Sequence, residues 1–172
     1  MFFSVRDLEL RKARFNVAIP PGQIEFLDQK LRQATLLEAE GTVELVANTL
    51  GEIRVTGHLK VRMEAECDRC LESAYFPLDE PFDVYYRPSD STENRAETAI
   101  DEGESEVGFY EGGGLELNDV LREEILLLLP MQRICSESCK GICPVCGRNR
   151  NQSECHCHVQ PADDRWSALR NL

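Results

Sequence analysis

The feature that most constrains the fold of this chain is a run of fifteen residues, Ile53 to Cys67, in which apolar or small residues alternate with polar ones. Side chains on a strand point alternately to opposite faces, so the pattern predicts a strand with one buried face and one face in water. The inward-facing residues are Ile53, Val55, Gly57, Leu59, Val61, Met63, Ala65 and Cys67. Most strands are shorter, and we therefore expect a bend or bulge near Gly57.

Two shorter runs with the same period precede this strand, at residues 14–19 and 37–47. Residues 48–51 contain the Asn and Gly typical of a turn, so the second run and the long strand are expected to form an antiparallel hairpin. A further strand is predicted at residues 75–86. It contains two prolines, which cannot donate to a ladder, so it is expected at an edge of the sheet or broken in two.

Three short helices are also predicted. The spacing of apolar residues indicates a helix over residues 23–33. A better-defined helix is expected from Asn118, as its N-cap, to Leu129, because Pro130 cannot continue a helix. A last helix is predicted at residues 163–169.

Charge is distributed unevenly along the chain. The net charge is −12, and residues 63–134 hold 19 acidic and 5 basic side chains, whereas each flanking region has a net charge of +1. Residues 88–105 lack periodicity and are rich in acidic and small residues, which predicts a disordered loop. The acidity serves either as a solvated segment or as a face for a basic partner such as a ribosomal protein. An acidic chain is a poor general nucleic-acid binder, because phosphate contacts dominate that affinity.

Six of the eight cysteines lie in the 23 residues from Cys135 to Cys157. Their centre, CPVCG at 143–147, has the pattern of a zinc knuckle: the proline pre-sets the turn, and the glycine permits a positive φ after the second ligand. The favoured zinc ligands are Cys143, Cys146, Cys155 and Cys157. Further candidates are Cys135, Cys139, His156 and His158. Spacing alone therefore leaves the ligand set open.

A second pair, Cys67 and Cys70, stands at the end of the long strand. It is half of a zinc site, a redox pair whose thiolate Arg69 favours, or a structural pair with Cys67 on the apolar face. A strand, rather than a long helix, is expected after Cys70, which argues against redox chemistry. Eight cysteines divide into two Cys₄ sites, for example with Cys67, Cys70, Cys135 and Cys139 in one. One or two structural zinc ions are expected, with iron as an alternative.

No catalytic residue is predicted, because a closed Cys₄ site leaves no position for a water molecule. The chain contains no P-loop, no dinucleotide-binding glycine pattern and no GxSxG motif, so no small-molecule substrate is expected. Each zinc site carries a charge of −2, which offsets nearby positive side chains. The candidate contacts with RNA or a protein partner are Arg69, Lys140, Arg148 and Arg150.

Together these patterns predict an α+β fold, with a mainly antiparallel β-sheet, a few short helices and a C-terminal zinc-binding cysteine module. The expected organisation is an antiparallel β-rich core at residues 1–87, an acidic disordered loop at 88–105, and a helix with the cysteine-rich module at 106–172, packing on the core. No apolar run approaches the ~18 residues of a membrane span, and early charged residues argue against a targeting segment. A cytoplasmic location, where thiols stay reduced, is therefore expected.

Several stretches of the chain resemble the YceD family of large ribosomal RNA subunit accumulation proteins. The matching stretches are CDRCLE at 67–72, LNDVLREEILLLLP at 117–130, CKGICPVCGRN at 139–149, CHC at 155–157 and DRWSALRNL at 164–172. They follow the order of the family and span most of the chain from residue 50 onward, whereas the residues before them fit only in strand pattern.

The resemblance implies a cytoplasmic bacterial protein needed for normal levels of 23S ribosomal RNA, with relatives in plant organelles implicated in ribosomal RNA processing. No enzymatic activity is assigned to the family. The expected function is a non-enzymatic factor in 23S ribosomal RNA accumulation and large-subunit biogenesis, with large-subunit ribosomal RNA or its precursor as partner. The alternatives are an acidic adaptor that binds a basic ribosomal protein and a thiol oxidoreductase that uses Cys67 and Cys70.

Overall fold

The structure is a computed structural model in which residues 1–89 and 107–157 are described. The acidic loop expected at 88–105 therefore lies almost wholly outside the described residues, as does the helix expected at 163–169. None of the helices in the described part of the chain has the length and apolar character that a membrane crossing requires.

The chain divides into two compact units. The first comprises residues 1–65 and 75–131, and the second comprises residues 66–74 and 132–172. The first unit contains most of the sheet and the longer helix, and the second contains all eight cysteines. The packing of a C-terminal module on the core, and the domain boundaries expected from the sequence, stay predictions.

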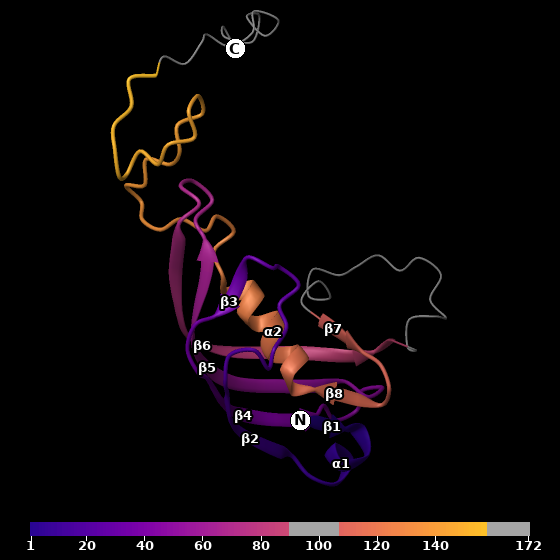
Figure 1. The fold of residues 1–172 in the computed structure, drawn as a ribbon. Helices are drawn as coiled ribbons and strands as arrows, with labels where there is room; N and C mark the ends of the chain where they lie inside the picture. The colour runs from indigo at the N-terminus through magenta and orange to yellow at the C-terminus, as the bar shows by residue number, and fades with distance from the viewer. Residues whose placement is uncertain (90–106, 158–172) are drawn as a thin grey trace, which may run out of the picture. The chain divides into compact units, whose positions relative to one another are not determined.

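A six-stranded sheet forms the body of the first unit (Figure 1). Its strands are β2 (Ala13–Ile19), β3 (Leu31–Gln33), β4 (Leu37–Leu45), β5 (Ile53–Glu66), β6 (Ser73–Pro88) and β7 (Val107–Tyr110). The order is β2-β4-β5-β6-β7, with β3 also paired to β5. The pairings β2–β4, β3–β5 and β4–β5 are antiparallel, and β6–β7 is parallel. The predicted α+β class with a mainly antiparallel sheet is confirmed.

The predicted hairpin of β4 and β5 is confirmed, and its register contains no bulge near Gly57, whereas the bend expected there as the alternative stays a prediction. The register runs without an extra residue from Leu45–Ile53 to Glu38–Lys60 and passes through the Gly41–Gly57 pair. A Cβ atom on Gly57 would lie 2.6 Å from the carbonyl oxygen of Glu40 and 2.8 Å from the ring of Phe82. Gly57 therefore admits an aromatic ring close to the backbone.

Strand β6 is also longer and more regular than predicted, since it is neither broken at its prolines nor an edge along its whole length. It runs through Pro77 and Pro81 as one strand and lies between β5 and β7. Its pairing with β7 involves only Tyr85 to Pro88. Both prolines precede that stretch, so their missing N–H groups remove no hydrogen bond from it.

The predicted helix over residues 23–33 is wrong. Gly22 has a φ of +89°, Leu27 is 93% exposed, and the last three residues of the segment form β3. Ile24 and Leu31 are both buried, but they reach the core from a loop and a strand. Three apolar residues at helical spacing are a weak signal, because tertiary packing can bury the same residues without a helix.

The longer helix, α2 (Leu117–Leu128), lies close to its predicted position and ends before Pro130. Its N-cap is Glu116 rather than Asn118, and no side chain caps it by a hydrogen bond. The most deeply buried side chains of the first unit come from β4, β5 and α2: Leu37, Val43, Ile53, Val55, Leu59, Met63, Leu117, Val120, Leu121 and Ile125. The inward residues of the long alternating run therefore meet the apolar face of this helix in one core.

Several short elements were not predicted from the sequence, β3 and β7 among them. Strand β1 (Phe2–Ser4) pairs antiparallel with β8 (Gly114–Glu116), directly before α2. Helix α1 (Val5–Leu10) follows β1, and the N–H of Asp7 donates to the Ser4 side chain that caps it. Elements of three to six residues are too short to leave a periodic signal.

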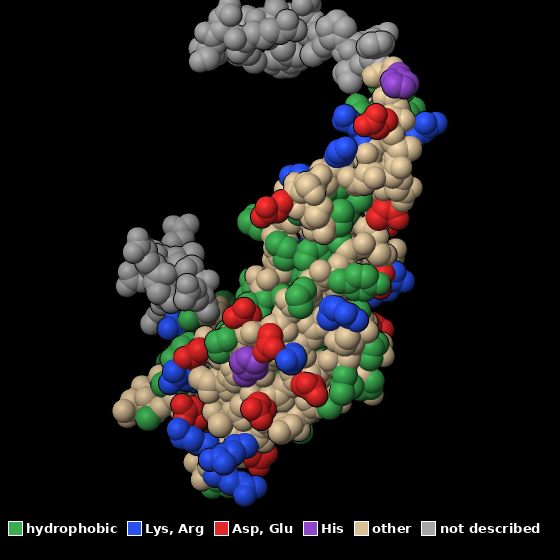
Figure 2. All heavy atoms as spheres, turned by 90° about the vertical axis from the view of Figure 1, so that its left-hand side faces the viewer, with side chains coloured by type: hydrophobic (Ala, Val, Ile, Leu, Met, Phe, Trp, Pro, Cys, Tyr) green, Lys and Arg blue, Asp and Glu red, His purple; other side chains and the backbone are tan. Residues whose placement is uncertain are grey.

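The solvent-exposed face of the sheet carries paired charges. Arg54 on β5 donates two hydrogen bonds to Asp83 on β6, at 2.9 and 2.6 Å. Further along β5, His58 and Lys60 both contact Asp79 on β6, at 3.2 and 2.8 Å. Figure 2 shows acidic and basic side chains interspersed over this part of the surface. The described face of the sheet therefore carries positive and negative side chains in pairs and forms no patch of one charge.

Candidate metal centres

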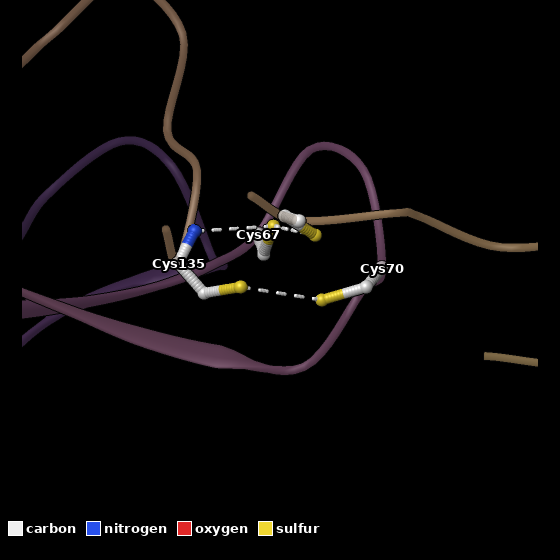
Figure 3. A group of neighbouring side chains, drawn as sticks. Cys67, Cys70 and Cys135 are labelled. Carbon is white, nitrogen blue, oxygen red and sulfur yellow. Dashed lines mark hydrogen bonds between the residues drawn. The ribbon is translucent and has the colours of Figure 1, made fainter. Parts of the chain in front are cut away.

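Four cysteine sulfurs converge where the loop between β5 and β6 meets the segment that follows α2. Cys67 and Cys70 lie in the loop, and Cys135 and Cys139 lie in the later segment; we call these four residues the first cluster. The loop is a tight turn in which Cys67 N–H donates to Glu72 O at 2.8 Å and Leu71 N–H donates to Cys67 O at 2.9 Å. This turn places both loop sulfurs on one side (Figure 3).

Asp68 and Arg133 join the two segments of the first cluster. Asp68 N–H donates to Arg133 O at 2.7 Å, and Arg133 N–H donates to the Asp68 carboxylate at 2.6 Å. Arg69 adds a second connection, since its guanidinium donates to the carbonyl oxygens of Glu137 and Cys139 at 3.5 and 3.4 Å. These contacts bring Cys135 and Cys139 to a loop that lies some seventy residues earlier in the chain.

The spacing of the sulfurs in the first cluster fits a tetrahedral metal site. Cys67 Sγ lies 3.9 Å from Cys139 Sγ, and Cys70 Sγ lies 3.7 Å from Cys135 Sγ. All four sulfurs lie within 4.8 Å of one another. Zinc–sulfur bonds of ~2.3 Å at tetrahedral angles would put neighbouring sulfurs about 3.8 Å apart. The four residues can therefore hold one metal ion with little rearrangement.

Two thiols of the first cluster are prepared for ligation by hydrogen bonds. Burial opposes ionisation of Cys67, but backbone N–H groups of Cys70, Cys135 and Arg69 outweigh it and lower its pKa to about 6. The amide of Asn151 donates to Cys139 Sγ at 3.3 Å and lowers the pKa of that thiol. Thiolates are the form that binds metal, so these groups favour metal binding before any ion arrives.

The second cluster comprises Cys143, Cys146, Cys155 and Cys157, whose sulfurs also lie within 4.8 Å of one another. The knuckle turn has the expected form: Gly147 N–H donates to Cys143 O at 2.8 Å, and Gly147 has a φ of +70°. Backbone N–H groups of Cys146 and Val145 point toward the Cys143 sulfur and lower its pKa to about 6. This cluster can hold a second ion.

The structure thus brings together both sets of four cysteines considered from the sequence, although metal ligation itself stays a prediction. Within the described residues, His156 joins neither cluster, and His158 lies beyond them. The sulfur of Cys67 contacts that of Cys139, and the sulfur of Cys70 contacts that of Cys135, so the four thiols form one group rather than an isolated pair.

The basic residues proposed as partner contacts differ in their surroundings. Arg69 is engaged with backbone carbonyls of the first cluster. Lys140, next to Cys139 of the first cluster, is exposed, and so are Arg148 and Arg150, which lie between Cys146 and Cys155 of the second cluster. Sequence reasoning missed Asp68 and Asn151, because an exposed Asp or Asn carries no local pattern that marks it as a partner of a residue far along the chain.

A strand-rich fold with two Cys₄ centres defines this chain as a protein with a cysteine-rich, candidate metal-binding unit. The profile of the YceD family, described as large ribosomal RNA subunit accumulation protein YceD, matches residues 55–172, and the chain belongs to this family. The matched residues include all eight cysteines. The resemblance seen in the sequence is therefore confirmed.

Among curated proteins, the chain is similar to uncharacterised proteins of Mycobacterium tuberculosis and Mycobacterium bovis, at 28% identity over 138 residues. The match covers 80% of this chain and 62% of the mycobacterial proteins. A chloroplastic protein of Arabidopsis thaliana, large ribosomal RNA subunit accumulation protein YCED homolog 1, is 31% identical over 58 residues, which cover 34% of this chain and 18% of that protein. No solved structure matches.

Proposed function

We propose that this protein is a non-enzymatic factor in the accumulation and processing of 23S ribosomal RNA and in large-subunit biogenesis. The observation that carries the proposal is the family match over residues 55–172. The name of the Arabidopsis relative points to the same process. The match covers about three fifths of the length of the mycobacterial relatives. The role of the whole protein is therefore part of the proposal. The proposed location is the bacterial cytoplasm.

The two clusters are proposed to hold structural zinc. A zinc ion bound by four thiolates has no open coordination position, so it stabilises a fold instead of activating water. An ion in the first cluster would hold the loop after β5 to the segment after α2. An ion in the second cluster would close the knuckle that follows. Neither role requires a substrate, which supports a binding or assembly factor over an enzyme.

The proposed partner is large-subunit ribosomal RNA or its precursor, approached through Arg148, Arg150, Lys140 and Arg69. The alternative is that the acidic middle of the chain binds a basic large-subunit ribosomal protein and shields its charge before assembly. The net charge of −12, which two Cys₄ zinc sites would make more negative, favours this adaptor role.

Cross-linking in cells separates the two roles. The tagged protein is purified after ultraviolet irradiation of cells of its own species, and the attached RNA and co-purified proteins are identified. Cross-links to 23S ribosomal RNA or its precursor support direct contact with RNA. A basic ribosomal protein recovered without cross-linked RNA supports the adaptor. Depletion of the protein that leaves 23S ribosomal RNA unchanged would contradict both.

A further inference from the structure

Asn151 belongs to one cysteine cluster by sequence and to the other by contact. It lies in the loop between Cys146 and Cys155, two residues of the second cluster. Its side-chain amide nonetheless donates a hydrogen bond to the sulfur of Cys139, in the first cluster, at 3.3 Å. The loop that connects two candidate ligands of one site thus supplies a hydrogen-bond donor to a candidate ligand of the other.

The orientation of this amide is fixed by its second contact. The Asn151 Oδ1 atom accepts a hydrogen bond from the backbone N–H of Lys140, the residue next to Cys139, at 2.8 Å. A backbone N–H can only donate, so the oxygen must face Lys140 and the NH₂ group must face the sulfur. The geometry is that of a donor aimed at a thiolate.

The position of Asn151 depends on the backbone of the same loop. Its own N–H donates to the side chain of Asn149 at 2.9 Å, and Arg150 N–H donates to Gly141 O at 2.9 Å. Asn149 in turn forms an antiparallel bridge with Ile142, beside Cys143. The loop is short and both of its ends are ligands of the second cluster, so a metal ion there would restrict it to this conformation.

We propose that Asn151 couples the two metal centres, so that metal in the second cluster increases the affinity of the first. This inference rests on the proposed binding of metal by both clusters. When the knuckle is closed, the Asn151 amide is held against Cys139 and stabilises the thiolate that ligates the first ion. When the knuckle is empty, the loop is released and that hydrogen bond is lost. Thermodynamic linkage makes the coupling reciprocal.

The test is cadmium NMR of the full chain, in which each Cys₄ site gives its own resonance and chelator competition reads both affinities. Asn151→Asp keeps an oxygen for Lys140 N–H but replaces the donor with a carboxylate. We expect it to weaken the first cluster by about 10- to 100-fold, the usual effect of losing a hydrogen-bond partner of a metal ligand. Because Asn151 is exposed, the substitution is expected to leave the fold intact.

The coupling itself is read from a double-mutant cycle. Cys155→Ser, which disables the second cluster, is expected to weaken the first cluster in the wild-type background and to have no further effect when Asn151→Asp is present. Gln152→Ala is the matched control, because this amide of the same loop donates to Glu72 rather than to sulfur, and it should change neither affinity.

Two results would overturn different claims. If the wild-type chain binds two ions, but neither Asn151→Asp nor Cys155→Ser alters the affinity of the first cluster, the coupling is rejected. The proposed metal sites then remain intact. A wild-type chain that binds no cadmium or zinc at all would reject the metal sites themselves, and the coupling with them.

Discussion

Asp68 and Arg133 exchange two hydrogen bonds, one from each backbone N–H, across a separation of 65 residues. The pair stands next to Cys67 and two residues before Cys135, so it aligns the two segments that supply the first cluster. It does so without contributing a ligand. A metal site assembled from distant segments needs such alignment, since the ligands must otherwise be ordered by the ion alone.

Replacing Asp68 tests this role. Asp68→Ala removes the acceptor for Arg133 N–H and is expected to weaken metal binding in the first cluster about tenfold, within the range for partners that orient ligands. The second cluster should be affected less, because the change reaches it only through the reciprocal coupling proposed above. Asp68→Asn keeps an acceptor oxygen and should retain most of the affinity. Equal affinity in Asp68→Ala and the wild type, measured by chelator competition, would rule out the alignment role.

Zinc removal is expected to loosen the second unit selectively. Without metal, thiolates no longer hold the 67–72 loop or residues 135–157, whereas the sheet keeps its own core. Chelation should therefore accelerate amide hydrogen exchange in those two segments and leave Val43 and Leu59 protected. Mass spectrometry of the exchanged chain provides the measurement. Unchanged exchange in residues 135–157 after complete zinc loss would contradict a structural role for the metal.

The core of the first unit provides a test of stability that does not involve metal. Leu59 is fully buried, so Leu59→Ala is expected to lower the free energy of unfolding by about 2–5 kcal/mol. Leu127→Ala is the matched control, because that side chain is 77% exposed and should cost less than about 1 kcal/mol. Urea unfolding followed by circular dichroism compares the two. Similar losses for both would place Leu59 outside the core.

Asp83 on the exposed sheet face gives a pH-dependent prediction. The hydrogen bonds from Arg54 lower the pKa of its carboxyl below the usual value. A carboxyl with a lowered pKa in the folded state stabilises the fold above its unfolded pKa, and this contribution is lost as the pH falls through the folded pKa. NMR titration should show Asp83 protonating at lower pH in the wild type than in Arg54→Met. Identical titration curves would mean that the pair does not persist in solution.

The adaptor alternative makes a separate prediction. If the acidic segment recognises a basic ribosomal protein, deletion of residues 89–105 should abolish binding at low salt, because that segment carries much of the negative charge. Calorimetry with the ribosomal protein that co-purifies would measure this. Replacing the segment with a neutral linker of equal length controls for the change in length. Binding that survives the deletion unaltered would assign the contact to another surface.

The sequence indicated those parts of the fold that repeat a local pattern. The alternation from Ile53 to Cys67 located β5 to within one residue, and the apolar spacing before Pro130 located α2. The helix expected at residues 23–33 was wrong, because Ile24 and Leu31 are buried by neighbours that are distant in sequence. Strands β1 and β8 stabilise each other and carry no signal separately.

The same distinction applies to the candidate site. Cysteine spacing indicated the knuckle, because its residues are close in sequence, and the division of eight cysteines into two sets suggested the first cluster. Asn151 and Asp68 could not be found in this way. Each acts through hydrogen bonds to residues that only the folded chain brings near.

The first cluster joins residues 67 and 139, which are 72 positions apart, and therefore encloses β6, β7, β8 and α2 in a single loop of chain. An ion bound there would act as a removable cross-link, which would disfavour the unfolded chain much as a disulfide does, although reducing conditions would not break it. It also sets an order of events during synthesis. Cys67 and Cys70 leave the ribosome long before Cys135 and Cys139, so the site is completed only after the enclosed segments have been made.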